Sequence, residues 1–127
     1  MSDTGELLYS KDHEWIRIVG GVARVGITDF AQDALGDVVF LQPPRLGDAV
    51  RSGDSLGEVE STKSVSDIYA PVSGTIVSVN TELLDNPALI NSDPFGAGWI
   101  CEIEVGADVD LSDLMDEGSY RQLVQGS

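Results

Sequence analysis

Lys63 has the setting best suited to chemistry, because it stands near the centre of the polar segment 60–67. Small polar residues surround it, and one acid precedes it by three positions while another follows it by four. Ser, Thr and Lys between two valine-containing runs predict the exposed tip of a hairpin. A primary amine at such a tip can carry a covalently attached group, or it can be a solvated turn residue that keeps a strand edge soluble. The local spacing leaves both interpretations open.

Several kinds of catalytic site are disfavoured by the residue inventory. His13 is the only histidine, so a histidine-pair metal site is excluded, and no segment has the spacing of a glycine-rich phosphate loop. A Cys101–His13 dyad is disfavoured because Cys101 falls on the apolar face of a predicted strand. A Schiff-base lysine needs a lowered amine pKa, whereas the acids beside Lys63 favour the charged ammonium. The acidic run 108–117 lacks the spacing of a calcium loop.

The elements that must position Lys63 are predicted to be β-strands. Fourteen glycines and five prolines divide the sequence into short segments, many of them rich in Val and Ile. The clearest strand is Trp99–Val105, where apolar residues alternate with Glu102 and Glu104 at the period of two expected for a sheet with one wet face. Further strands are predicted at 16–18, 23–27, 37–42, 56–61, 65–69 and 74–79, giving about seven or eight in all.

Helical signals are few. Thr28 or Asp29 can cap a short helix over 29–35, and Gly36 stands where the end of that helix is expected. A turn of helix is predicted at 82–85. Two C-terminal helical segments are predicted at 112–117 and 119–124, packed against the β-structure.

A similarity between two segments of the chain suggests how the strands are arranged. Residues 36–42 resemble residues 74–80 at an offset of 38 residues, and each segment is followed by a loop and then a strand that ends in Glu. Two such halves are each too small to bury a face alone, so we expect them to form one sandwich about an approximate two-fold axis. The segment 60–67 lies between the two halves.

Length and charge limit the function classes. The 127 residues predict a single domain spanning 1–127, and 7 basic against 22 acidic residues give a net charge of −15. Nucleic acid and anionic membranes are disfavoured as partners because they would be repelled. No run of 18 apolar residues is present, the N-terminus lacks the basic start of a signal peptide, and one cysteine suits a reducing compartment. We therefore expect a cytoplasmic protein.

Taken together, five segments resemble the H-protein family of the glycine cleavage system, whose members are lipoyl carriers. The matching segments, in order, are 9–15, 25–32, 35–40, 60–74 and 91–99. The resemblance implies a mainly β fold of the barrel-sandwich hybrid type, a flattened barrel of two quasi-symmetric halves with a few short peripheral helices. It implies a carrier subunit rather than an enzyme.

The resemblance also implies roles for particular residues. Lys63 is expected to carry lipoate in amide linkage. Glu60 and Asp67 are expected to contribute to recognition by a lipoate ligase or lipoyltransferase. The lipoyl group on Lys63 would form an arm that carries an aminomethyl group. His13 and Glu14 are expected to line a cleft that shelters this loaded arm, with Glu14 as the carboxylate that holds the cationic amine.

The implied partners are glycine decarboxylase, aminomethyltransferase and dihydrolipoyl dehydrogenase, served by a monomeric carrier. The acidic excess would complement basic entrances on these enzymes, or it would only aid solubility. A lipoyl or biotinyl carrier domain of another multienzyme complex is the alternative, since those domains share the tip lysine. Biotinyl domains usually place Met on both sides of the lysine, whereas this chain has Thr62 and Ser64.

Overall fold

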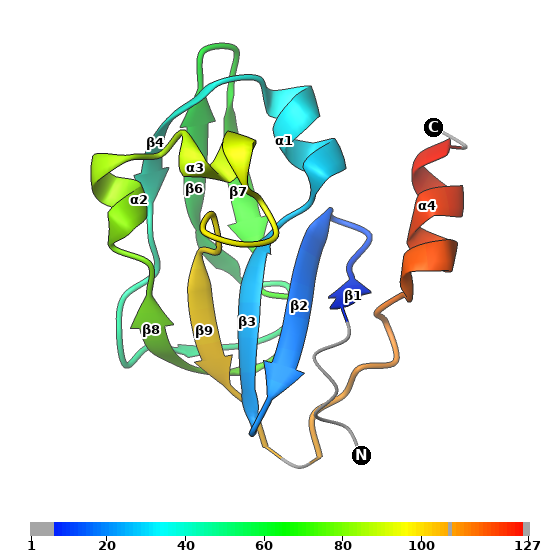
Figure 1. Cartoon of the computed structure of the whole chain (residues 1–127). Coiled ribbons are helices and arrows are strands. Elements are labelled where there is room, and N and C mark those ends of the chain that lie inside the picture. Colours follow the sequence, from blue (N-terminus) through cyan, green and yellow to red (C-terminus); the bar gives the residue numbers. More distant parts are fainter. Residues whose placement is uncertain (1–6, 107, 126–127) are drawn as a thin grey trace.

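The computed structural model describes residues 7–106 and 108–125, which form two antiparallel sheets with four helices around them (Figure 1). The larger sheet contains, in spatial order, β1 (Leu7–Tyr9), β2 (Glu14–Val19), β3 (Val22–Ile27), β9 (Cys101–Glu104), β8 (Gly74–Val79) and β5 (Ala49–Val50). The smaller sheet contains β4 (Val38–Gln42), β6 (Ser55–Ser61) and β7 (Val65–Tyr69). The mainly β, barrel-sandwich prediction is confirmed.

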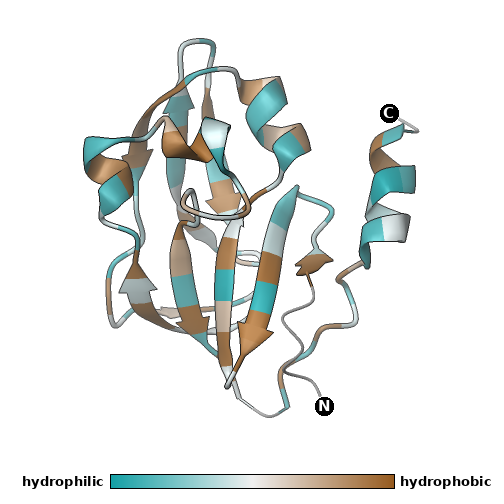
Figure 2. Cartoon of the chain, in the orientation of Figure 1, coloured by the Kyte–Doolittle hydropathy of each residue, from teal (hydrophilic) through white to brown (hydrophobic). Residues whose placement is uncertain are grey.

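The core lies between the inner faces of the two sheets. Val25 and Ile103 of the larger sheet and Leu41, Val59 and Ile68 of the smaller one are buried in the same apolar cluster. Burial alternates along β7, and Figure 2 shows hydrophobic and hydrophilic bands along the strands. Burial of one face of each strand supplies the main driving force for folding.

In the part of the chain that the structure describes, four helices lie outside the sheets. They are α1 (Asp29–Leu35), α2 (Glu82–Asp85), α3 (Leu89–Ser92) and α4 (Glu117–Gln125). The predicted start and end of α1 are confirmed: the hydroxyl of Thr28 accepts a hydrogen bond from the backbone N–H of Ala31, and Gly36 follows with φ of +82°. The turn of helix at 82–85 is confirmed as α2.

The predicted helix at 112–117 is wrong. Met115 pairs with Tyr9 of β1 in a β-bridge, with backbone hydrogen bonds of 2.8 and 2.7 Å in the two directions. The second C-terminal prediction is confirmed in a longer form, since α4 begins at Glu117. A sheet edge that offers free backbone groups competes with local helix formation, and here the sheet edge wins.

The predicted strand at Trp99–Val105 is shorter than expected. Strand β9 begins at Cys101, and Ile100 and Cys101 are both fully buried, so the alternation does not extend back to Trp99. The Trp99 ring lies under the guanidinium of Arg24, 4.3 Å from its centroid, on the outer side of the larger sheet.

The two similar segments, 36–42 and 74–80, have matching irregularities in the two sheets. Strand β4 has a register shift between Val38 and Phe40, and β8 has one between Ile76 and Ser78. The residues at the two shifts lie 38 residues apart, which is the offset seen in the sequence.

Gly36 and Gly74 begin the two similar segments, and glycine is needed at each position for a different structural reason. Gly36 ends α1 in the left-handed region, where glycine avoids the cost of a Cβ. Gly74 approaches the backbone of β9 so closely that a Cβ would overlap the carbonyl oxygen of Glu104.

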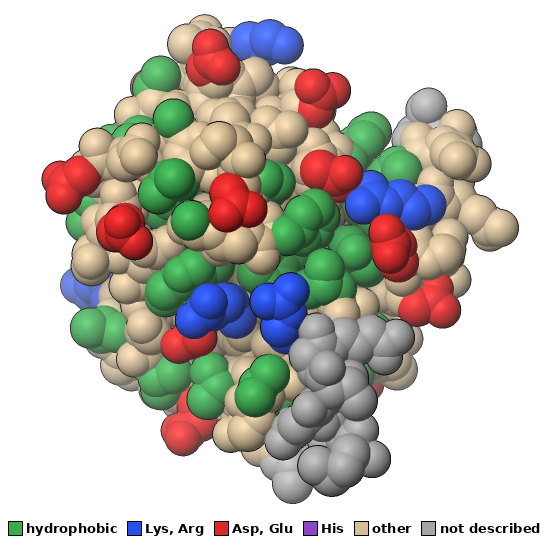
Figure 3. All heavy atoms as spheres, in the orientation of Figure 1, with side chains coloured by type: hydrophobic (Ala, Val, Ile, Leu, Met, Phe, Trp, Pro, Cys, Tyr) green, Lys and Arg blue, Asp and Glu red, His purple; other side chains and the backbone are tan. Residues whose placement is uncertain are grey.

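The surface carries many acidic side chains, and Figure 3 shows them scattered over one face with basic side chains among them. Within residues 7–106 and 108–125, no helix is long and apolar enough to cross a membrane.

Candidate functional site

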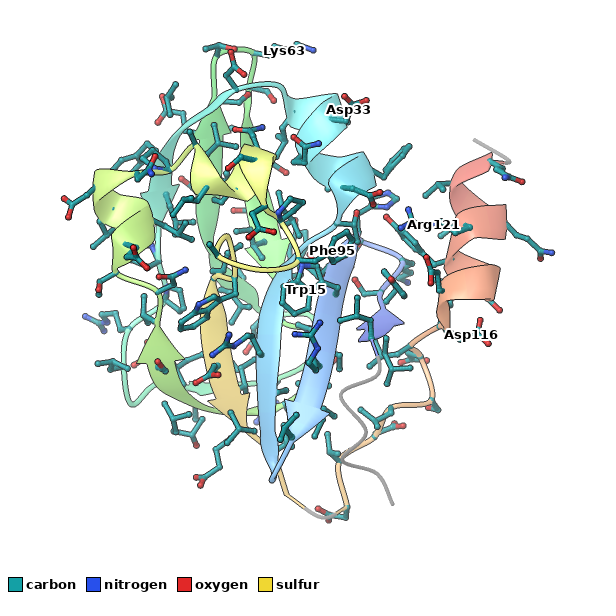
Figure 4. The ribbon with its side chains drawn as sticks, viewed as in Figure 1. Trp15, Asp33, Lys63, Phe95, Asp116 and Arg121 are labelled. Carbon is teal, nitrogen blue, oxygen red and sulfur yellow. The ribbon has the colours of Figure 1, made fainter. Side chains whose placement is uncertain are left out.

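Lys63 lies exposed at the tip of the β6–β7 hairpin, as the sequence predicted (Figure 4). Ser61, a buried residue at the end of β6, builds the turn. Its hydroxyl accepts hydrogen bonds from the backbone N–H groups of Lys63 and Ser64, both at 3.1 Å, and its own N–H donates to the carbonyl of Ser64 at 2.8 Å. The backbone of the lysine is therefore fixed while its side chain reaches into solvent.

The tip is also tied to the loop that follows α1. The N–H of Thr62 donates to the carbonyl of Asp37 at 3.0 Å. The Lys63 side chain passes over Gly36, where an added methyl group would lie 3.2 Å from Lys63 Cε. A rigid support under a mobile amine suits a covalent attachment site.

A cleft of about 190 Å³ separates α1 from β7 and the β1–β2 turn. Its apolar walls include Phe30, Leu35 and Ile68. His13, Glu14 and Asp67 also line it, so the structure brings together three of the residues that the sequence singled out.

Glu14 is buried and fully engaged rather than solvated. Ser10 donates its hydroxyl to one carboxylate oxygen at 2.6 Å, and the backbone N–H of Tyr69 donates to the other at 3.1 Å. Burial raises the pKa of Glu14 from 4.5 to about 7, although these two hydrogen bonds lower it. Near neutral pH, Glu14 can therefore be either protonated or charged.

His13 connects the cleft to the C-terminal helix. Its backbone has a φ of +70°, and its ring lies 4.8 Å from the ring of Phe30. Its Nδ1 atom is 2.9 Å from the hydroxyl of Tyr120, which is 2.7 Å from the hydroxyl of Thr28. Burial lowers the pKa of His13, which favours the neutral ring.

A consistent proton arrangement follows from these contacts. The Thr28 hydroxyl accepts from the N–H of Ala31 and donates to Tyr120, which donates in turn to Nδ1 of neutral His13. The α1 cap, α4 and the cleft thus share one hydrogen-bond chain.

Further contacts hold α4 against the body. The rings of Tyr9 and Tyr120 stack with centroids 4.7 Å apart, and Arg121 pairs with Asp29 of α1 at 3.0 Å. In Figure 4 the Arg121 side chain points from α4 towards the body. Sequence reasoning missed the roles of Ser10, Ser61 and Tyr120. The partners of Tyr120 lie 107 and 92 positions away, whereas Ser10 and Ser61 bond residues within four positions, so a local turn signal could have found them.

Glu60 and Asp67 lie on the two strands of the hairpin, and both are exposed. Glu60 is opposite Val65, and Asp67 is opposite Glu58. Asp67 is also 3.5 Å from the hydroxyl of Tyr69. The two acids therefore flank the tip without burial, as expected.

Thiolate chemistry at Cys101 is disfavoured. Cys101 is buried in the apolar core, and burial raises its thiol pKa to about 12, so the thiolate is strongly disfavoured. Among the described residues, no group of three or more His, Cys, Asp or Glu side chains is placed to hold a metal ion.

Two facing sheets with a lysine at an exposed hairpin tip define the barrel-sandwich class of carrier domains. The comparisons with known proteins narrow this class. Residues 7–127 match the family profile described as "Glycine cleavage H-protein". The chain therefore belongs to the glycine cleavage H-protein family.

Individual relatives agree over nearly the whole chain. A glycine cleavage system H protein of Carboxydothermus hydrogenoformans is 47% identical over 120 residues, which cover 94% of this chain and 92% of that protein. One from Micrococcus luteus is 57% identical over 116 residues, covering 90% and 91% respectively. The crystal structure of a glycine cleavage system H protein from Mycobacterium marinum matches with a TM-score of 0.86 at 46% identity, covering 97% of this chain and 98% of that one.

Proposed function

We propose that this chain is the lipoyl carrier of a glycine cleavage system and that lipoate is attached to Lys63. The observation that carries the proposal is the position of Lys63, exposed on a turn that Ser61 fixes and within a chain that belongs to this family. The exposed amine is accessible to an attaching enzyme. The carrier receives the aminomethyl group of glycine at the pyridoxal-phosphate-dependent glycine decarboxylase and delivers it to the tetrahydrofolate-dependent aminomethyltransferase. Dihydrolipoyl dehydrogenase then reoxidises the carrier.

The residues present fit such an arm. The dithiolane of lipoate supplies the redox and group-transfer chemistry when it is attached. The cleft offers apolar walls, including Phe30 and Leu35, to a hydrocarbon chain, and Glu14 and Asp67 are among the residues that line it. These walls limit the access of water to whatever occupies the cleft.

Glu14 is suited to receive a positive charge at neutral pH. Its pKa of about 7 means that a cationic amine nearby would draw it into the ionised form. Ser10 and the N–H of Tyr69 already hold both carboxylate oxygens in place, so ionisation needs no rearrangement of these donors. His13 lines the cleft beside Glu14, and its hydrogen bond to Tyr120 holds its ring in place.

Intact mass and peptide mapping test the attachment. Protein isolated from its own host under lipoate-replete growth should carry one lipoyl increment, which maps to Lys63. Lys63→Arg should fold normally and carry none, while Lys11→Arg, at the other lysine of the chain, should be modified like the parent. A biotinyl increment would support the alternative carrier class, and a permanently unmodified mass would contradict both.

Glu60 and Asp67 are proposed to act in recognition by the lipoate ligase or lipoyltransferase. Both acids are exposed, so neutralising either should change the free energy of unfolding by under about 1 kcal/mol. Glu60→Gln should slow lipoylation with little change in Tm. A large loss of stability with an unchanged rate of modification would assign Glu60 to the fold instead.

We also propose that the cycle runs in the cytoplasm, since a single buried thiol suits a reducing compartment. The net charge of −15 supports electrostatic attraction to basic entrances on the three enzymes.

A further inference from the structure

The outer face of the smaller sheet carries a row of side chains with an unusual composition. Strand pairing places Phe40 of β4 opposite Glu60 of β6, and Glu60 opposite Val65 of β7. Directly opposed residues on neighbouring strands point to the same side of a sheet. All three are exposed, Phe40 by 50% and Val65 by 57%. The row therefore presents an acid between two apolar side chains to solvent.

This row is the part of the sheet next to the lysine tip. The next row away from the tip consists of Gln42, Glu58 and Asp67, which are all polar and exposed. The apolar surface is thus concentrated beside the residues that hold Lys63.

The irregularity in β4 creates this exposure. Val38 and Leu41 are buried, and the register shift between Val38 and Phe40 leaves both Val39 and Phe40 half exposed. A bulge of this kind re-aims a side chain, and here it sets Phe40 opposite Glu60.

The larger sheet shows that the fold does not require apolar residues in such a row. Strand β8 contains the segment that resembles β4. Its bulge places Ser78 opposite Glu102, and Glu102 is opposite Arg24. Again a glutamate occupies the centre, but its neighbours are polar or charged. Strand pairing therefore does not explain why apolar residues occupy positions 40 and 65.

We propose that the row Phe40–Glu60–Val65 is the docking surface for the enzyme that attaches lipoate to Lys63. This inference rests on the proposed function. The attaching enzyme must bring its catalytic site to Nζ of Lys63, so it must contact the protein surface beside the tip. Enzymes that act at the far end of an attached arm do not face this requirement.

The side chains in the row indicate which groups the partner must present. Phe40 and Val65 fit an apolar strip, and Glu60 between them fits a basic side chain, with Glu58 and Asp67 adding negative charge behind. A second copy of this chain is a poor occupant, because its net charge of −15 would be repelled by these acids.

Steady-state lipoylation by a purified lipoate-attaching enzyme, with the unmodified carrier as the varied substrate, tests the inference. Phe40→Thr combined with Val65→Thr keeps residues that favour strands and should raise KM for the carrier by about tenfold, with kcat changed by less than about twofold. Val19→Thr combined with Val77→Thr is the matched control, because these valines are 54% and 43% exposed on the larger sheet. The control should leave both parameters within about twofold of the parent.

Each outcome has one meaning once Tm shows that both double variants are folded. An unchanged KM in the Phe40/Val65 variant, or an equal rise in the control, would overturn the docking surface. Val65→Thr alone provides a milder test if the double variant is unstable, and it should raise KM in the same direction. Sedimentation of the parent as a dimer that the Phe40/Val65 variant abolishes would assign the row to a second copy and overturn the proposal. Failure of the parent to accept lipoate at Lys63 would instead refute the proposed function.

Discussion

Glu14→Gln should change how the stability of this protein depends on pH. Glu14 is 2% exposed, and burial raises the pKa of its carboxyl group from 4.5 to about 7 in the folded state. In the unfolded chain the group returns to its ordinary value. Between these two values the folded state holds a proton that the unfolded state has lost, so stability falls as pH rises. The contribution is fully present below about pH 4.5 and is lost as pH rises through about 7.

The size of the effect follows from the shift. One pKa unit corresponds to about 1.4 kcal/mol, so the parent should lose about 2.5 kcal/mol between pH 5 and pH 8 through this group. Gln cannot ionise, and its amide can still accept from the N–H of Tyr69 and donate towards the hydroxyl of Ser10. The variant should therefore be less sensitive to pH than the parent by this amount.

Urea unfolding followed by tryptophan fluorescence at pH 5, 6, 7 and 8 measures the difference, since Trp15 is fully buried. Glu58→Gln is the matched control, because it removes one negative charge at an exposed position on β6. It accounts for the general repulsion among 22 acids. If both variants follow the pH dependence of the parent in parallel, Glu14 does not titrate as its burial implies, and the reasoning fails.

The remaining predictions concern the arm and its supports. With lipoylated protein loaded by the decarboxylase and then separated from it, Glu14→Ala should release ammonia a few times faster than the parent when no transferase is present; identical rates would refute a sheltering role. Gly74→Ala should lower the free energy of unfolding by about 2 kcal/mol or more, because its Cβ would meet the Glu104 carbonyl, whereas Gly36→Ala should cost only about 1 kcal/mol for its positive φ. The reverse order in chemical denaturation would contradict these two reasons. Tyr120→Phe should cost about 1 to 2 kcal/mol by removing the hydroxyl between His13 and Thr28, and it should shift the NMR signals of the single histidine; unchanged signals would contradict the contact.

The sequence by itself determined much of the strand pattern and the hairpin tip, because both depend on local signals. Alternation of apolar and polar residues fixes which side of a strand is buried, and the polar turn residues around Lys63 can only be accommodated at a surface. The cap at Thr28 and the end of α1 at Gly36 were readable for the same reason, since a helix end is built from neighbouring residues.

Only the tertiary structure decided the state of Glu14 and the role of the C-terminus. Glu14 was expected to be a carboxylate lining a cleft, but its pKa depends on burial and on an N–H donor at Tyr69, 55 positions away in the chain. Met115 sits in a predicted helix, yet it pairs with the edge at Tyr9, and Tyr120 meets His13 across 107 positions. No local pattern encodes such contacts, because they form only when the chain is packed and each polar group takes the partner that packing brings within reach.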